Sequence, residues 1–570
     1  MKTKLSLAIT LALFGAGMLS GCSDDKEPTA VAVKQEAQKN IAAPMLKYIP
    51  ADSPYFVAAH ETLPEQDAFD LYQRMQPQGS LESDLDDMRD MLYDIDDEVL
   101  YSLMSFFIAL GEELVGVESL SDAHALGIKM SPQVAIYGLG ILPVLRMELQ
   151  DEDAFRESVQ RILTKSEISL DTSTTDGTEY WVLSPEAPVK AIMAIIDQQL
   201  VVSVVPQDAS DDLLSHVLGK TLPESNIGDT GALAEIEKRH GFTPYGAGQL
   251  YSSRLLNELS TPTHAGTHAL LEAFDAELLD LSACQADIDR ITSRFPGLVM
   301  GMREYNLNRM EINAILVTDK DIVSDLRAIT AQVPGLGSTE GMASFGLGLN
   351  LPVLVQTVQK YAQDVRQNPF SCDELQDLNS SWNEINMAIN NPVTMMIGPT
   401  LSGFRARIDS LTMKDGEPSG TGILTLASQN PLALLSAASS FVPDLVSLGL
   451  EPGGEVKKIE SMMLPPDAPD LYAAMSHTAL ALGVGISDSS VLQAELNAPA
   501  ADRNLLVHGH LRGEFYHSLA DFMEQMGSDD DMTEFDIDML RQYADIYKNM
   551  EYWFRVDDEG VEMSFSLELN

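Results

Sequence analysis

Short stretches of apolar and small residues recur along the chain, and an amphipathic segment follows each of them after a polar or proline break. A short apolar run bounded in this way is typical of a β-strand, and apolar positions three and four residues apart indicate a helix. Asp or Ser begins several of the amphipathic segments, as helix N-caps prefer. Six such units are Val134–Leu142 with Asp151–Leu163, Leu200–Val205 with Ser210–Leu218, Ile312–Thr318 with Asp319–Ile329, Ala343–Leu349 with Pro352–Gln367, Leu480–Ile486 with Ser487–Leu496, and Leu505–Leu511 with Glu514–Met526.

The succession of these units predicts an α+β fold, with mixed or largely antiparallel sheets and helices packed on them. Parallel βαβ winding stays open as an alternative, because helices of these lengths also fit that arrangement. Gly335 and Gly337 mark a loop near the middle of the chain. We therefore expect an N-terminal α+β lobe at 45–335 and a C-terminal α+β lobe at 336–570.

A Pro-Asp-Pro turn before an extended apolar run occurs twice, in Tyr48–Ala59 and in Leu464–Ala474. Proline fixes the turn and the apolar run indicates a strand. Turns of this kind also open a broad group of uncharacterised bacterial envelope proteins, which this chain resembles. The two copies do not divide the chain at residue 335, so we do not expect the halves to be clean duplicates.

The first residues form a charged and then apolar leader. Lys2 and Lys4 precede the uncharged segment Leu5–Leu19, which is shorter than the roughly 20 residues that span a bilayer. The leader ends in Leu-Ser-Gly-Cys, with the cysteine at Cys22. This motif resembles the lipobox of a bacterial lipoprotein signal peptide.

The lipobox resemblance implies that residues 1–21 are a signal peptide and that Cys22 carries acyl chains such as palmitate. Two chains already give stable anchoring. Ser23, rather than Asp, follows the cysteine, which by the same resemblance points to the outer membrane. Residues 22–44 are polar and predict a flexible tether, so the protein is expected to face the periplasm from a lipid anchor.

Charge excludes some classes of partner. The chain has 86 acidic and 36 basic residues, a formal net charge of −50 at pH 7. Such a charge repels phosphate backbones and anionic headgroups, so we expect no nucleic-acid partner and contact with the membrane only through Cys22. Hydrophobic residues make up 45% of the chain, enough for a folded core. The apolar stretch Leu432–Leu450 contains Pro443 and Asp444 and predicts a buried helix pair rather than a membrane span.

Apart from Cys22, the cysteines are Cys284 and Cys372. An even pair in an oxidising compartment favours a disulfide bond. In the loop-entropy view such a bond stabilises the fold by roughly 4–5 kcal/mol. Two buried free thiols are the alternative.

The histidines offer weak metal-site candidates. His508 and His510 alternate on one side of a strand, and Glu514 and His517 follow, which is the kind of ligand set that zinc uses.

A second histidine group consists of His264, His268 and Glu272, which share one helix face. The His-Glu-x-x-His motif of zinc proteases is absent, and Gly266 weakens the helix. For both groups a polar structural role is the favoured interpretation, so no cofactor is expected.

Two acidic helices are expected at Ser80–Glu98 and Ser528–Asn549. They lack the spacing of a calcium-binding EF-hand loop, so solvated helix faces are favoured. Serine-hydrolase and phosphate-loop motifs are also absent from the sequence.

The sequence therefore favours a lipid-anchored, non-catalytic binding or assembly module of the periplasm. The 27 methionines mostly suit core packing, but they also support an alternative, a carrier of lipid or another apolar ligand. A zinc-dependent hydrolase using His508, His510 and His517 is the remaining alternative, and whether the protein is an enzyme is left open.

Overall fold

The computed structural model describes residues 44–75, 80–93, 95, 98–166, 168, 170–183, 188–274, 284–372, 375–389, 400–414, 417–439, 448–460, 469–526 and 531–570. The leader, the lipobox with Cys22 and nearly all of the expected tether lie outside these residues, as do Ser528 and the Pro-Asp-Pro turn of the second copy. Among the described residues, no helix has the length and apolar character needed to cross a membrane.

The chain divides into two compact units. Unit 1 contains residues 1–292 and 296–310, and unit 2 contains residues 293–295 and 311–570. The loop with Gly335 lies within unit 2, because Val333 and Leu336 are buried in a core cluster with Ala427 and Leu505. The packing of these two loop residues explains why the glycines there do not mark the division between the units.

Unit 1 is a sheet with helices in the connections between strands. After the short helix η1 (Leu46–Tyr48), its elements are β1 (Tyr55–Ala58), α2 (Glu65–Met75), α3 (Ser80–Leu92), α4 (Glu98–Val115), α5 (Leu120–Ala125), β2 (Val134–Leu139), β3 (Leu142–Glu148), α6 (Glu152–Lys165), β4 (Asp171–Thr175), β5 (Thr178–Leu183), β6 (Val189–Ile196), β7 (Gln199–Pro206), α7 (Asp211–Leu218), α8 (Ile227–Thr230), α9 (Ala232–His240), β8 (Ala247–Tyr251), α10 (Ser252–Ser260), α11 (Ala265–Ala273), α12 (Gln285–Arg294) and β9 (Gly297–Tyr305). Its strand order is β9-β8-β1-β2-β3-β7-β6-β5-β4, and every neighbour in that order is antiparallel.

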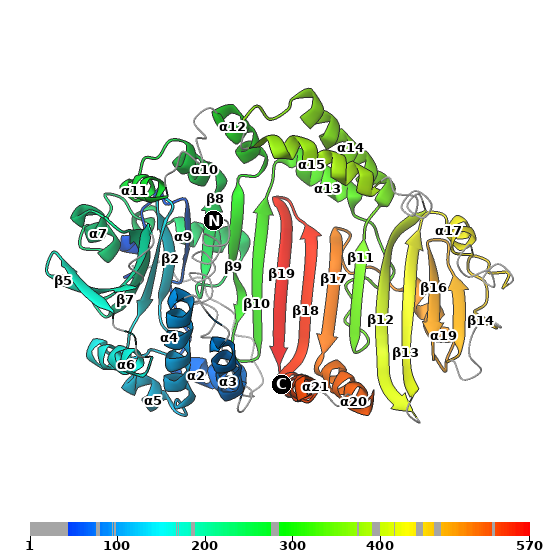
Figure 1. The fold of residues 1–570 in the computed structure, drawn as a ribbon. Coiled ribbons are helices and arrows are strands. Elements are labelled where there is room, and N and C mark those ends of the chain that lie inside the picture. The colour runs from blue at the N-terminus through cyan, green and yellow to red at the C-terminus, as the bar shows by residue number, and fades with distance from the viewer. Residues whose placement is uncertain are drawn as a thin grey trace, which may run out of the picture. The chain divides into compact units, whose positions relative to one another are not determined.

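Unit 2 has the same kind of construction (Figure 1). Its elements are β10 (Arg309–Val317), α13 (Lys320–Ile329), β11 (Ala343–Gly348), α14 (Leu351–Gln367), α15 (Gln376–Ile389), β12 (Leu401–Lys414), β13 (Glu417–Ser428), α17 (Pro431–Ala438), β14 (Lys457–Ile459), β15 (Leu471–Met475), β16 (Ala479–Val484), α19 (Ser490–Asn497), β17 (Leu505–Arg512), α20 (Gly513–Met526), α21 (Asp531–Ile546), β18 (Tyr547–Val556) and β19 (Gly560–Leu569). Its strand order is β10-β19-β18-β17-β11-β12-β13-β16-β15-β14, and the neighbours from β19 to β14 are antiparallel.

These pairings confirm the α+β class and the antiparallel sheets, and they exclude the parallel alternative for the described strand pairs. All six predicted strand-then-helix units form. The predicted caps form in three of them, where Asp151, Ser210 and Asp319 accept hydrogen bonds from backbone amides in the first turns of α6, α7 and α13. The second acidic helix is shorter than expected and gives way to β18 at Tyr547.

The two units repeat one topology that the sequence pattern does not reveal. Eight strands of unit 1, in the order β9-β8-β1-β2-β3-β7-β6-β5, correspond one by one to β18-β17-β11-β12-β13-β16-β15-β14 of unit 2. The helices fall in the same connections: α6 and α17 follow β3 and β13, and α7 and α19 follow β7 and β16. The second Pro-Asp-Pro copy precedes β15, which corresponds to β6 and not to β1, so the copies do not mark this repeat.

Cys284 and Cys372 both lie in the described part of the chain and form a disulfide bond, as the even count predicted. Both side chains are buried.

Candidate functional site

The middle of the unit 2 sheet has one face that is largely apolar and carries no charged residue. Side chains alternate between the faces of a strand, so the strand registers give the residues that share a face. Three rows run across the sheet from β15 to β19 on one face. The rows are Leu471, Val484, Gly422, Ile408, Ala343, Leu511, Met550 and Leu567; Ala473, Leu482, Leu424, Ala406, Phe345, Gly509, Tyr552 and Phe565; and Met475, Leu480, Leu426, Phe404, Leu347, Val507, Phe554 and Met563.

The part of this surface that runs from β16 to β19 is called the open face. It exposes several large apolar side chains to solvent. Val484, Leu424, Ile408, Phe345 and Phe565 are 36–41% exposed. On β10, which neighbours β19, Ile312 and Leu316 are also exposed. A large exposed apolar patch on a soluble protein commonly marks a binding site.

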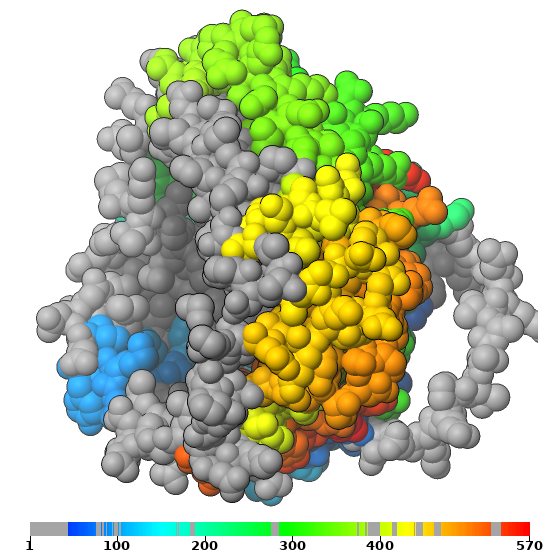
Figure 2. Space-filling model, turned by 90° about the vertical axis from the view of Figure 1, so that its right-hand side faces the viewer, coloured from blue at the N-terminus to red at the C-terminus, as the bar shows by residue number. Residues whose placement is uncertain are grey.

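One end of the apolar rows is closed. Leu435 of α17 and Leu450 pack on Ala473, Met475 and Leu480 of β15 and β16. Figure 2, viewed from this end, shows residues of β15, β16, α17 and α19 as a continuous yellow and orange surface with α14 above it. The open face therefore begins where the contacts of α17 end.

The floor of the open face is built around two close contacts. The rings of Phe345 and Phe404 meet edge to face, with centroids 5.7 Å apart. The ring of Tyr552 lies against Gly509, where a Cβ atom would come within 2.4 Å of Tyr552 Cζ. Glycine is therefore required at position 509, because any side chain would displace the tyrosine ring.

The opposite face of the same strands carries polar and charged residues, and it is buried. Its two rows, called the polar face, are Tyr472, Gly483, Ile423, Arg407, Ser344, His510, Glu551 and Ser566; and Ala474, Ala481, Thr425, Arg405, Gly346, His508, Trp553 and Ser564. Sheets with one solvated face ordinarily place the apolar side in the core. The unit 2 sheet departs from this pattern on its central strands and is called inverted for that reason. Its charged residues there are covered, next to the apolar core that Ile423, Ala474 and Ala481 form with α19, while five large apolar side chains of the other face are 36–41% exposed.

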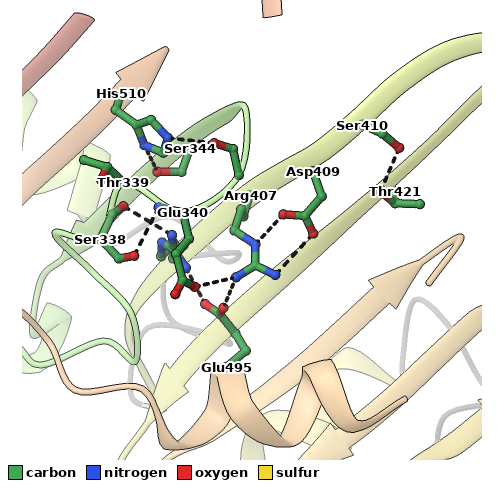
Figure 3. Close-up of polar contacts among 12 residues, drawn as sticks. Ser338, Thr339, Glu340, Ser344, Arg407, Asp409, Ser410, Thr421, Glu495 and His510 are labelled. Carbon is green, nitrogen blue, oxygen red and sulfur yellow. Dashed lines mark hydrogen bonds and ion pairs between the residues drawn. The ribbon is translucent and has the colours of Figure 1, made fainter. Parts of the chain in front are cut away.

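An ion-pair network joins the polar face to α19, the helix that packs on it (Figure 3). Arg405 Nη1 donates to Glu495 Oε1 at 2.6 Å, and Arg407 Nη1 donates to Glu495 Oε2 at 2.8 Å. Both arginines and Glu495, which lies on α19, are buried. Arg407 also pairs with Asp409 at 2.8 Å and with Glu340 at 3.2 Å.

The covering loop fits closely around this network. Gly335 has a φ of +72°, and a Cβ there would lie 2.7 Å from Arg405 Nη1 and 2.8 Å from Glu495 Oε1. Glycine at this position therefore serves both the backbone conformation and the space of the ion pair.

Unit 1 secures its equivalent helix in a related way. Arg146 of β3 is fully buried, and its Nη2 donates to the carbonyl oxygen of Val217 near the end of α7, at 3.0 Å. The negative end of the helix dipole favours a cation at this place. The apolar face of unit 1 differs from that of unit 2, because Val57, Ile136 and Leu145 are only half-buried and no large apolar side chain of the described unit 1 strands exceeds 36% exposure.

The candidate histidines of β17 belong to the polar face. His508 Nε2 lies 3.0 Å from Glu551 Oε1. Ser344 Oγ lies 2.7 Å from His510 Nδ1, and His510 Nε2 lies 3.3 Å from the carbonyl oxygen of Gly341. A neutral His510 ring protonated on Nε2 satisfies both of its contacts.

Burial, together with the electrostatic influence of the neighbouring His508, Arg512 and Arg405 side chains, lowers the pKa of His510 to about 4. The uncharged ring is therefore the form that fits this buried position.

The structure does not bring the third histidine to the other two. His517 lies on α20, is half exposed and pairs with Asp545 at 3.3 Å. No group of three His, Cys, Asp or Glu side chains among the described residues is arranged to hold a metal ion. The zinc site considered from the sequence thus finds no ligand set in the described part of the chain.

Of the other histidine group, His264 lines a polar pocket in unit 1, whereas His268 and Glu272 lie on α11 and are not among the residues of that pocket. His264 caps rather than joins α11, and its Nδ1 lies 2.9 Å from Glu258 Oε1, while its Nε2 lies 3.4 Å from Asp52 Oδ2. Burial alone would raise the pKa of Glu258, but hydrogen bonds from Thr263, Thr267 and His264 lower it to about 2. The contacts of Glu258 tie α10 to the start of α11, a structural role. The pocket has a volume of about 430 Å³ and also includes Arg254 and Gln285.

Sequence reasoning missed the residues that define the site. Arg405 and Arg407 stand two positions apart on one strand, and that spacing could have placed them on a common face. Their partner Glu495 lies about 90 residues further along the chain, and no local pattern connects it to them.

Comparisons with known proteins identify no relative of this chain, so a functional assignment rests on the geometry described above. No protein-family model, no curated protein and no solved structure matches the chain.

Proposed function

We propose that this protein is a lipid-anchored lipoprotein of the bacterial envelope that binds acyl chains on the open face of unit 2. The single observation that supports the acyl-chain ligand is the inverted sheet, with an uncharged apolar face exposed and a charged face buried. The anchor rests on the lipobox at Cys22, and the outer membrane is its proposed site. A binding module fits these features without a catalytic step.

The dimensions of the open face suit a lipid. Seven strands from β16 to β19 span about 29 Å at a strand spacing of about 4.8 Å, and three rows of side chains span about 13 Å along the strands. Within that extent Leu480, Ala343 and Leu567 are buried, and the exposed part consists of the large side chains that are 36–41% exposed, an apolar patch of the kind that is often functional. Each methylene that leaves water on this surface contributes roughly 0.8 kcal/mol.

A fluorescence titration tests the binding proposal. The probe is cis-parinaric acid, and the protein is the chain from residue 22 with Cys22→Ser, which keeps every described residue. We expect saturable binding that Leu424→Asp weakens at least about tenfold, because the acyl chain must then desolvate a carboxylate. Leu222→Asp, at an exposed leucine of unit 1 outside the strands, is the matched control and should bind like the parent. Equal binding by both variants, or no saturable binding, would refute the proposal.

The anchor has a separate test. Cells expressing the full chain or its Cys22→Ser variant are labelled with radioactive palmitate and fractionated. We expect label in the parent only, and recovery with the outer membrane. An unlabelled parent that fractionates with soluble proteins would contradict the anchor while leaving the binding test unaffected.

A further inference from the structure

We infer that the open face has a lid within unit 2, and that this lid is helix α15, which closes over a bound acyl chain. This inference rests on the proposed function and specifies how the same site is opened and closed. The observations that carry it are the topology shared by the two units, the helix that covers the equivalent face of unit 1, and the exposed apolar side chains of α15.

The open face has an equivalent surface in unit 1. One row of the unit 1 sheet runs over β6, β7, β3, β2, β1 and β8 through Met193, Val202, Leu145, Ile136, Val57 and Gly248. The corresponding strands of unit 2 carry the central row from Ala473 to Gly509, so a glycine ends both stretches. The equivalent helices α6 and α17 also pack on these two faces, at the same end of each.

A helix from the connection between β1 and β2 covers part of the unit 1 face. Phe106 of α4 packs against the core cluster that α6 forms with Trp181 and Met193. The corresponding connection of unit 2 runs from β11 to β12 and contains α14 and α15, which pack on each other near the end of β11 (Figure 1). The shared topology therefore makes this helical hairpin the expected cover of the open face.

Of the two helices, α14 is the anchored one. Asp325 of α13 accepts hydrogen bonds from Lys360 Nζ at 2.5 Å and from Tyr361 Oη at 2.7 Å, both on α14. The turn after α14 is fixed as well, because Cys372 is disulfide-bonded. These contacts hold α14 on α13, so α15 is the helix that closes.

Apolar side chains of α15 face solvent. Leu378 and Ile385 are 40% and 43% exposed, much like the exposed residues of the open face. They stand seven residues apart, close to two helical turns, and therefore lie on one side of the helix. An acyl chain on the open face gives these side chains an apolar surface to cover. Because the ligand makes these contacts only in the closed arrangement, its binding shifts the helix toward closure.

Pulsed electron paramagnetic resonance tests the lid, because it measures the distance between two spin labels. The protein is the chain from residue 22 with Cys22→Ser, in which Cys284 and Cys372 are bonded to each other and take no label. One label is placed at Thr412→Cys, toward the end of β12 that is far from α15, and the other at Asn386→Cys on α15.

Binding of cis-parinaric acid should shorten the distance between these labels. Asn386 stands ten residues into α15, about 15 Å from its start, so closure should shorten the distance by at least about 5 Å. The matched control pair keeps Thr412→Cys and places the second label at Gln363→Cys on the anchored α14. Its distance should not change.

The affinity for the same probe gives a second readout. The double variant Leu378→Asp, Ile385→Asp should bind cis-parinaric acid at least about threefold more weakly, because the closed helix would then desolvate two carboxylates. Leu222→Asp should bind like the parent, and circular dichroism checks that both variants fold.

Each outcome separates the lid from the proposed function. Saturable binding with an unchanged distance, with equal shortening in both label pairs, or with unchanged affinity in the double variant would overturn the lid and leave the proposed function standing. If cis-parinaric acid shows no saturable binding to the parent, both the lid and the proposed function are overturned.

Discussion

Neutralising Glu495 tests the inverted sheet most sharply, because this buried carboxylate pairs with two buried arginines at once. Its oxygens lie 2.6 Å from Arg405 Nη1 and 2.8 Å from Arg407 Nη1, and its side chain is 2% exposed. Removing one partner of a buried ion pair typically costs about 3–5 kcal/mol, since the remaining charge stays desolvated. Glu495→Gln keeps the shape of the side chain and removes only its charge, so we expect a loss of about 4 kcal/mol.

Thermal unfolding followed by circular dichroism measures this loss. For a unit of this size each kcal/mol lowers Tm by roughly 2–4 °C, so Glu495→Gln should lower the Tm of unit 2 by about 10 °C. The matched control is Glu340→Gln, because Glu340 pairs with the same Arg407 but is 73% exposed. Exposed pairs contribute about 0–1 kcal/mol, so the control should change Tm by no more than about 2 °C. Equal shifts in the two variants would refute the claim that the polar face is buried by a required ion pair.

Three further predictions concern other parts of the two units. Because the pKa of His510 is about 4 in the folded chain and about 6.5 when unfolded, the unfolded state binds more protons between these values. Stability should therefore fall by up to about 3 kcal/mol as pH drops from 6.5 to 4, and urea titrations of His510→Gln should show a smaller fall. The pKa of Glu258 is lowered to about 2, so the stabilisation that its carboxylate contributes is present above pH 4.5 and is lost as pH falls toward 2. Glu258→Gln should therefore lower Tm at pH 7 but not at pH 2. An equal decrease at both pH values would contradict this. Gly509→Ala should cost about 1–3 kcal/mol by displacing Tyr552, and the cost should vanish in a Tyr552→Ala background; a persistent cost would show that the ring is not the cause.

The strands and helices could be predicted because their signals are local. The short apolar run Leu200–Val205 and the serine before α7 are both contained in a short segment, and the structure forms strand and cap there. The antiparallel pairing follows less directly, since parallel winding would use the same elements. Strand registers, which join residues far apart in the chain, decided between the two.

The open face could not be predicted from the alternation of side chains between the two faces of a strand. A period of two assigns Phe404, Ala406 and Ile408 to one face and Arg405 and Arg407 to the other, but it does not say which face is covered. The usual expectation buries the apolar side. Here the covered side is set by Glu495, which comes from a helix that follows four intervening strands, and by the loop at Gly335.

The histidine hypotheses failed for a similar reason. The spacing of His508 and His510 correctly placed both rings on one side of β17, and ring centroids 6.2 Å apart confirm it. The direction in which α20 leaves that strand is a tertiary feature, and it carries His517 to Asp545 instead. Sequence spacing could therefore supply two of the three proposed ligands and no more.

Photo-cross-linking with a diazirine-bearing fatty acid tests the central claim most directly, because it reports where the acyl chain lies. The delipidated chain is irradiated with the probe, digested and mapped by mass spectrometry. The account predicts adducts concentrated on the open face, in peptides containing Phe345, Leu424 and Phe565, and their loss when oleate competes. Adducts spread over both units, or adducts that oleate does not displace, would contradict it.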